Sequence, residues 1–306
     1  MVDTSRPVLV IGATGHQGGA TARELLARGR AVHAFVRDPD GPAAASLAAA
    51  GARLVPGNLD DPDSVRAALL EVDGVFLVLS PLSGPAITAA GLQAEQRRGR
   101  TVADLVAEVG VGHFVYSSVA GARQQSGVPQ IDGKGDLEAY LRSLDLPATI
   151  VRPAFFMENF ATLTRPVPVA GELVVKLPLR PDSPLQLIAT RDIGAIAAIA
   201  FQRPDELIGQ DLVIGGDILS GSVIAERFAS AWGIPARFQQ TPIEQVRAFD
   251  ENVAKMFEWF DSGRGEQADL AATRALHPGL ASLEGWLANA GQLRDSVVPG
   301  LLSAHE

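Results

Sequence analysis

Three glycines spaced three residues apart, Gly12, Gly15 and Gly18, follow an apolar run at residues 8–11 and precede a segment with helical spacing. A glycine-rich turn between a strand and a helix presents backbone N–H groups at the positive end of the helix dipole, which suits a phosphate. The spacing differs from the dinucleotide motif Gly-x-Gly-x-x-Gly, but both need a tight turn and a close backbone approach. The segment predicts a pyrophosphate-binding loop; the alternative is a tight turn without a ligand.

An arginine follows the second apolar run. Arg37 comes directly after residues 31–36, where an acidic residue would hold the adenine ribose of NAD. A guanidinium can bind a 2'-phosphate through two hydrogen bonds and stack on adenine. Arg37 therefore favours NADP(H) over NAD(H); the alternative is that it faces solvent or pairs with Asp38.

The elements that position these residues follow from the alternation of apolar runs with segments of helical spacing. We predict strands at residues 8–11, 31–36, 53–55, 74–79, 113–117 and 148–152, and helices at 19–28, 43–50, 63–70, about 89–109 and 134–143. Strands rich in Val, Leu and Ile without polar alternation require helices on both faces. The pattern predicts an α/β fold, a Rossmann doubly wound parallel sheet.

The regular alternation ends after residue 152. Residues 153–184 are rich in proline and phenylalanine, a helix is predicted from 190 to about 201 and a strand at 212–214, and the tail from about 219 is largely helical. We predict an NADP-binding domain of residues 1–152, with 185–215 returning to it. Residues 153–184 and 216–306 would form a smaller C-terminal α+β substrate or partner domain that closes over the carboxyl ends of the strands.

Composition removes several classes of function. The chain has no cysteine, and its five histidines never fall at the short spacing of metal ligands, so we expect no metal site. A formal net charge of −9 argues against a nucleic-acid partner. No run of eighteen apolar residues and no basic-then-apolar leader occurs, so we expect no membrane association and a cytoplasmic protein.

Seven motifs occur in order between about residues 6 and 200: VLVIGATGHQGG, AFVRDP, GNLDDPDSV, GVFLVLS, HFVYSSVAGA, RPAFFMENF and RDIGAIA. Together they resemble the NmrA-like family, an atypical branch of the short-chain dehydrogenase/reductase superfamily. The resemblance implies a Rossmann fold that binds NADP(H). It implies contacts to pyrophosphate from Gly12, Thr14, Gly15, Gln17 and Gly18, to the 2'-phosphate from Arg37, to adenine from Asn58 and Leu59, and to the nicotinamide-side ribose from Leu79, Ser80 and Pro81.

The residues of the superfamily's usual catalytic motif, Tyr-x-x-x-Lys, are only partly present. The lysine is represented by Lys134, but Gln130 stands four residues earlier, and an amide cannot act as a general acid. Ser117 and Ser118 offer two hydroxyls after the fifth strand, but the resemblance puts Val119 at the usual serine position. Neither Tyr116 nor Tyr140 is a natural replacement for the missing tyrosine. Lys134 is therefore the remaining catalytic candidate and a ribose ligand; the alternative is a solvent-exposed lysine at the start of a helix.

An aromatic segment follows the last predicted strand of the sheet. Phe155 and Phe156 suit a flat apolar substrate, with Asn159 as an orienting donor. Core packing between the two predicted domains is an equal alternative.

Two functions remain. The first is an NADPH-dependent reductase of a quinone-like or other conjugated aromatic small molecule, because hydride attack on such an acceptor leaves a delocalised anion and demands little of an internal acid. The second is a non-catalytic NADP(H)-binding redox sensor that acts through a protein partner. The sequence favours the first; a reductase or epimerase with the full triad is disfavoured because the tyrosine is missing.

Overall fold

The computed structural model describes residues 6–83 and 86–298, and the chain divides into two compact units. The first unit comprises residues 1–125, 129–153 and 190–213. The second comprises residues 126–128, 154–189 and 214–306. Each unit has its own hydrophobic core.

The first unit is built on a seven-stranded sheet in the order β13-β8-β7-β4-β1-β2-β3. Its strands are β1 (Val8–Ile11), β2 (Val32–Val36), β3 (Arg53–Pro56), β4 (Gly74–Val78), β7 (His113–Ser117), β8 (Ala148–Pro153) and β13 (Asp211–Ile214). The neighbours from β8 to β3 all pair in parallel. The chain starts at β1, moves outward through β2 and β3, and crosses back to continue from β4. The predicted doubly wound parallel sheet is confirmed.

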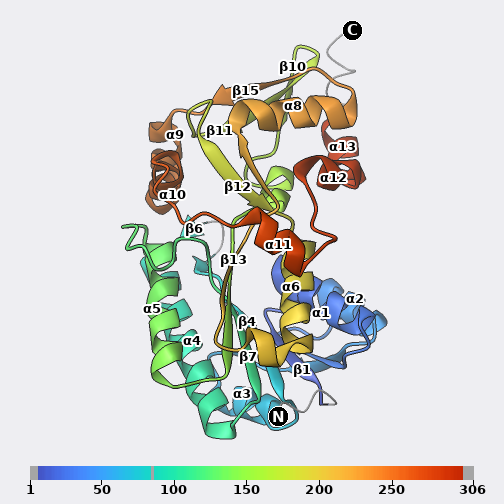
Figure 1. Cartoon of the computed structure of the whole chain (residues 1–306), viewed down its shortest axis with the longest axis vertical. Helices are drawn as coiled ribbons and strands as arrows, with labels where there is room; N and C mark the ends of the chain where they lie inside the picture. The colour runs from blue at the N-terminus through green and yellow to red at the C-terminus, as the bar shows by residue number, and fades with distance from the viewer. Residues whose placement is uncertain (1–5, 84–85, 299–306) are drawn as a thin grey trace. The chain divides into compact units, whose positions relative to one another are not determined.

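Helices cover both faces of this sheet (Figure 1). They are α1 (His16–Ala27), α2 (Pro42–Ala49), α3 (Pro62–Leu69), α4 (Ala89–Val109), α5 (Pro129–Ser143), α6 (Thr190–Gln202) and the short α7 (Pro204–Leu207). The short strands β5 (Leu82–Ser83) and β6 (Ala86–Ile87) pair antiparallel. In Figure 1, α4 and α5 lie on one face and α1 and α6 on the other. Strands β1, β2 and β7 are buried along their whole length, as apolar runs between two helical layers require.

Helices α1 and α6 cross at very short range. A side-chain carbon placed on Gly194 would lie 2.6 Å from the backbone carbonyl carbon of Ala20 and 2.7 Å from the backbone nitrogen of Thr21. Only glycine allows this approach, which holds the helix after the glycine loop against the sheet.

The second unit contains two three-stranded sheets and several helices. Its strands are β9 (Phe155–Phe156), β10 (Val167–Val169), β11 (Glu172–Leu177), β12 (Pro184–Ile188), β14 (Asp217–Ser220) and β15 (Ala236–Gln240). Its helices are the 3₁₀ turn η1 (Met157–Ala161), α8 (Gly221–Trp232), α9 (Ile243–Phe249), α10 (Glu251–Asp261), α11 (Leu270–Leu276), α12 (Leu283–Ala288) and α13 (Gly291–Val297). The sheets run β10-β11-β15 and β14-β12-β9. Within the described residues, every helix is too short or too polar to cross a bilayer.

A buried histidine links β7, β8 and the end of α7. His113 is fully buried; its Nε2 lies 2.8 Å from the Thr149 hydroxyl, which donates to the Leu207 carbonyl at 2.6 Å. Because that hydroxyl gives its proton to Leu207, the histidine Nε2 must carry the donor proton. Burial, helped by the charge of Arg30, lowers the pKa of His113 to about 4.

The first prediction concerns the acid stability that His113 confers. The folded state keeps this ring neutral down to about pH 4, whereas the unfolded chain protonates it near pH 6.5, so its contribution is complete above pH 6.5 and is lost as the pH falls towards 4. The contribution is at most about 3 kcal/mol. In His113→Gln, urea unfolding measured from pH 7.5 to 4 should show a shallower loss of unfolding free energy than the original protein. Equal slopes in both proteins would refute this role.

Candidate functional site

The register of the sheet brings the predicted cofactor residues to one edge. Ile11 pairs with Phe35 and with Leu77, so the carboxyl ends of β1, β2 and β4 lie level with one another. The chain leaves these ends at Gly12, Arg37 and Leu79, and leaves β3 at Gly57 and Asn58. The chain order reverses between β1 and β4, which is where open α/β sheets bind ligands.

The glycine loop is shaped by two contacts that no side chain could accommodate. Gly12 has φ +82°, and a carbon added to it would lie 2.6 Å from Val78 Cγ1. A carbon added to Gly18 would lie 2.1 Å from the Gly12 carbonyl oxygen. The turn therefore closes directly on the end of β4 and on the first turn of α1, which leaves the backbone exposed on its outer side.

The N-terminus of α1 is free of side-chain caps. The helix begins at His16, with Gly15 as its N-cap residue, and no side chain accepts a hydrogen bond there. The predicted start at residue 19 was wrong because the tight turn ends three residues earlier and Gly18 and Gly19 are already helical. Thr14, Gly15 and His16 are exposed, and the first turn has no acidic residue. These features fit a pyrophosphate, which would bind these N–H groups.

A serine of β7 is bonded to the first turn of α1. The Ser117 hydroxyl donates to Gln17 Oε1 at 2.6 Å. This bond orients the Gln17 amide and leaves its N–H groups directed elsewhere, as a predicted pyrophosphate contact requires. The neighbouring Ser118 hydroxyl is buried and has no hydrogen-bond partner in the described part of the chain.

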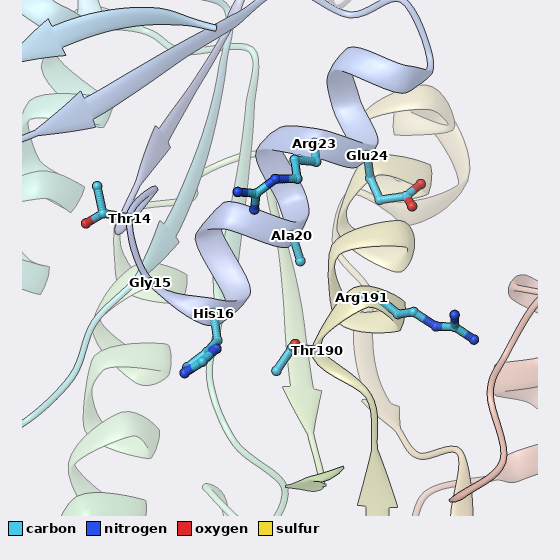
Figure 2. Close-up of a pocket in the computed structure, with 8 residues that line it drawn as sticks. All are labelled: Thr14, Gly15, His16, Ala20, Arg23, Glu24, Thr190 and Arg191. Carbon is cyan, nitrogen blue, oxygen red and sulfur yellow. The ribbon is translucent and has the colours of Figure 1, made fainter. Parts of the chain in front are cut away.

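A pocket of roughly 510 Å³ lies beside this loop. Figure 2 shows it extending from the loop along α1, with the start of α6 as its other wall. Its lining residues are Thr14, Gly15, His16, Ala20, Arg23, Glu24, Thr190 and Arg191. In Figure 2, Arg23 and Arg191 point in different directions, so their charges do not converge on one point.

Of the residues predicted at the adenine end, Arg37 and Asn58 are exposed and Leu59 is half-buried. In residues 6–83 and 86–298 the Arg37 guanidinium makes no hydrogen bond or ion pair, so it does not pair with Asp38. The Asn58 side chain accepts from the Asp60 backbone N–H at 3.1 Å, and this bond fixes the turn after β3. Leu59 packs against the core of the first unit.

Lys134 lies inside a helix and not before one. Helix α5 begins at Pro129, five residues earlier than predicted, because proline fits the first helical position, where its missing N–H costs nothing. Gln130 and Lys134 are therefore one helical turn apart on the same face of α5.

The Lys134 ammonium is buried with two partners. Its side chain is 12% exposed, and Nζ lies 2.7 Å from Glu95 Oε1, a carboxylate of α4 that is itself 2% exposed. Nζ also donates to the Leu79 carbonyl oxygen at 3.2 Å, at the end of β4. The predicted contacts Lys134 and Leu79 are thus brought together, whereas Ser80 is exposed and accepts from the Leu82 N–H. Sequence reasoning missed Glu95, because one acid in a polar helix carries no signal.

The Tyr116 ring lies beside the ammonium. Lys134 Nζ is 6.0 Å from the centre of this ring, which suits a cation–π contact. Burial raises the pKa of Tyr116 to about 12, and its hydroxyl has no hydrogen-bond partner in the described residues. Burial alone would lower the pKa of Lys134, but nearby acidic groups, among them the hydrogen-bonded Glu95, outweigh it and the pKa lies above its usual value. At neutral pH the lysine is therefore charged and the phenol is neutral.

A second buried ion pair fixes α5 to the sheet. Arg152 of β8 donates from Nε and Nη2 to the two oxygens of Glu138 at 2.8 and 2.6 Å. Both side chains are almost inaccessible to solvent. Arg152 also contacts Asp211 at 2.9 Å, and Arg142 and Arg123 pair with that same carboxylate. The network joins α5, β8 and β13.

The predicted substrate residues differ in their surroundings. Phe155 is buried in the core of the second unit, with ring contacts to Phe160, Phe257 and Phe260. This packing favours the core alternative for Phe155. Phe156 and Asn159 are half-buried, and the backbone carbonyl of Asn159 accepts from the backbone N–H groups of residues 162 and 164.

The model of the NmrA-like family matches residues 4–287. An NmrA-like family domain-containing oxidoreductase of Aspergillus hancockii is 30% identical over 269 residues, which cover 82% of this chain and 79% of the relative. The structure of NmrA, a negative transcriptional regulator in complex with NADP, has a TM-score of 0.79 at 22% identity and covers 96% and 98% of the two chains. An NADPH-dependent quinone oxidoreductase of Escherichia coli, complexed with NADPH, has a TM-score of 0.74 at 19% identity and covers 92% and 99%. At these identities the two structures show a shared fold.

The second prediction concerns the Arg152–Glu138 pair. Arg152→Met would leave the Glu138 carboxylate buried with only the 3.4 Å contact from Arg142, and loss of one partner of such a pair costs about 3–5 kcal/mol. Thermal unfolding followed by circular dichroism should show a large fall in Tm. In the control Arg123→Met, the lost contact to Asp211 is solvent-exposed, so the cost should stay below about 1 kcal/mol. Equal Tm values for the two variants would contradict the assignment.

Proposed function

Because this chain belongs to the NmrA-like family, we propose that it is an NADPH-dependent reductase of quinone-like or other conjugated aromatic small molecules. The observation that carries the proposal is the buried, charged Lys134 beside Leu79, at the edge of the sheet where the glycine loop begins. The E. coli quinone oxidoreductase shares the fold and the Aspergillus relative is an oxidoreductase, which supports this class of reaction.

The residues that would hold the cofactor are those at the carboxyl edge of the sheet. They are Gly12, Thr14, Gly15, Gln17 and Gly18 for the pyrophosphate, Arg37 for the 2'-phosphate, Asn58 and Leu59 for the adenine, and Leu79, Ser80 and Lys134 for the nicotinamide-side ribose. The uncapped start of α1 and the exposed Arg37 supply the two positive regions that such a ligand needs. A reduced nicotinamide supplies a hydride to an electrophilic acceptor.

Lys134 would act as a fixed positive charge in this reaction. An ammonium whose pKa is raised does not give up its proton readily near neutral pH, but it stabilises negative charge nearby. Gln130 cannot supply a proton either. The proton that completes reduction would come from water, so the best acceptors are those whose reduced form is a stable, delocalised anion. The predicted substrate contacts Phe155, Phe156 and Asn159 stay a prediction.

The third prediction tests catalysis by Lys134. The protein should oxidise NADPH in the presence of one or more members of a quinone panel, followed by nicotinamide absorbance. Lys134→Ala should lower kcat/KM about 100-fold, in the range for losing one charge-stabilising donor. Lys255→Ala removes an exposed lysine that pairs with Glu251, so it should leave the rate unchanged. The proposal is contradicted if the original protein turns over no quinone of the panel faster than Lys134→Ala does.

The fourth prediction tests cofactor choice. Thermal unfolding with NADP, NADPH, NAD and NADH at equal concentrations should show larger shifts with the two phosphorylated forms; a ligand at a hundredfold excess over Kd stabilises by about 2.7 kcal/mol. Arg37→Gln should abolish this difference, while Arg203→Gln, which removes another exposed arginine, should preserve it. Equal shifts with all four would remove the preference, and no shift with any would overturn the loop assignment.

The alternative is a non-catalytic NADP(H)-binding sensor that acts through a protein partner. It is favoured by Gln130, which replaces the usual proton donor on the same helical face as Lys134, and by the shared fold with the regulator NmrA. Such a protein would bind oxidised and reduced cofactor with different affinities and recruit a partner in one state only. Calorimetry with both forms, followed by capture of partners in each state, would separate it from the reductase.

A further inference from the structure

We infer that Glu95 is a positioning residue, which holds Lys134 as a permanently charged donor at the carboxyl end of β4. The catalytic purpose of Glu95 rests on the proposed function, whereas its position beside Lys134 does not. Glu95 approaches from α4, and Lys134 belongs to α5, so the pair bridges two helices. The adjacent residues form a second bridge, because Gln96 Nε2 donates to the Gly133 carbonyl at 2.6 Å.

Each member of the pair needs the other. A carboxylate that is 2% exposed and an ammonium that is 12% exposed are stable as ions only if they are paired and hydrogen-bonded. The 2.7 Å separation is that of a charge-assisted hydrogen bond. Removing Glu95 alone would leave the ammonium with the Leu79 carbonyl as its remaining hydrogen-bond partner among the described residues.

The other groups that face Lys134 cannot replace Glu95. Tyr116 of β7 has a pKa of about 12 and is neutral at neutral pH. Glu138, one turn along α5, already accepts from Nε and Nη2 of Arg152. Leu79 offers only a carbonyl dipole. Glu95 is therefore the carboxylate that balances the charge of Lys134, and it sets the direction of the side chain.

The geometry leaves one N–H of the ammonium for a ligand. An ammonium has three N–H donors, of which Glu95 and Leu79 accept two. Within residues 6–83 and 86–298 the third has no acceptor. A ligand hydroxyl or a developing oxyanion at the end of β4 would complete the set. Glu95 thus restricts the flexible Lys134 side chain, so that its remaining N–H points in one direction.

Direct titration of Lys134 in the full-length protein, without cofactor, tests the inference. The chain has three lysines, Lys134, Lys176 and Lys255, so ¹³Cε-lysine labelling gives three signals, and Lys134→Arg assigns the relevant one. In Glu95→Gln, burial is opposed by fewer charges, and the pKa of Lys134 should fall by about one unit or more. Glu108→Gln, which removes an exposed acid of the same helix, should change nothing. An unchanged Lys134 titration in Glu95→Gln would overturn the inference.

Cofactor affinity gives a second readout. The Kd for NADPH, measured by fluorescence, should vary little with pH between 7 and 10.5 in the original protein and in Glu108→Gln. In Glu95→Gln it should rise with pH as Lys134 loses its proton, and Glu95→Asp should restore part of the original profile. A flat profile in Glu95→Gln would count against the positioning role.

If Glu95→Gln folds poorly, thermal unfolding of single and double variants still tests the pairing of Glu95 with Lys134. Glu95→Gln and Lys134→Met each strand one buried charge, whereas Glu95→Gln/Lys134→Met strands none, so the double variant should have the highest Tm of the three. Additive losses would refute the pairing. If the proposed function is wrong and the Glu95 assignment is right, the pKa of Lys134 will shift in Glu95→Gln, but neither the original protein nor any variant will reduce a quinone. If Lys134→Ala abolishes activity and the titration does not shift, the reductase stands and the Glu95 assignment fails.

Discussion

Burial of charge along helix α5 constrains the candidate site more than any other interaction. Gln130, Lys134 and Glu138 follow one another at four-residue intervals, so they form one stripe of the helix, and all three are largely buried. Lys134 is neutralised by Glu95 from α4, and Glu138 by Arg152 from β8. A helix that buries charge in this way can occupy one register only, because a shift of one residue would leave two ions without partners.

The glycine loop obeys a steric constraint at the same edge of the sheet. Gly12 closes on Val78 and Gly18 on Gly12, so the loop is held by the end of β4, the strand whose next residue accepts from Lys134. The loop and the lysine therefore share one support. Ser117, which bonds to Gln17, and Tyr116, which lies beside Lys134, are consecutive residues of β7 that point to opposite faces of the sheet.

The fold was predictable because its signals are local and repeated. Fully apolar strands between helical segments require a parallel sheet covered on both faces, and this sheet and the helix at Ala89–Val109 follow the prediction. The strands within residues 154–188 were missed, because proline and phenylalanine interrupt any regular period there. The pairing of Lys134 was also beyond the sequence. Glu95 lies 39 positions away in a polar helix, and a polar stripe on α5 reads as a solvated face until packing shows that α4 and β8 supply its counter-ions.

The charge states of Lys134 and Tyr116 limit the proton chemistry available at the candidate site. Lys134 stays charged because Glu95 opposes the effect of burial, and the pKa of Tyr116 is about 12 in its buried position. Neither group exchanges a proton readily near neutral pH. A site of this kind can orient a ligand and stabilise negative charge, but it depends on water for protons. Under the proposed function, that restriction selects acceptors whose reduced anion is stabilised by conjugation, and it excludes simple ketones, whose alkoxide needs an acid within the site.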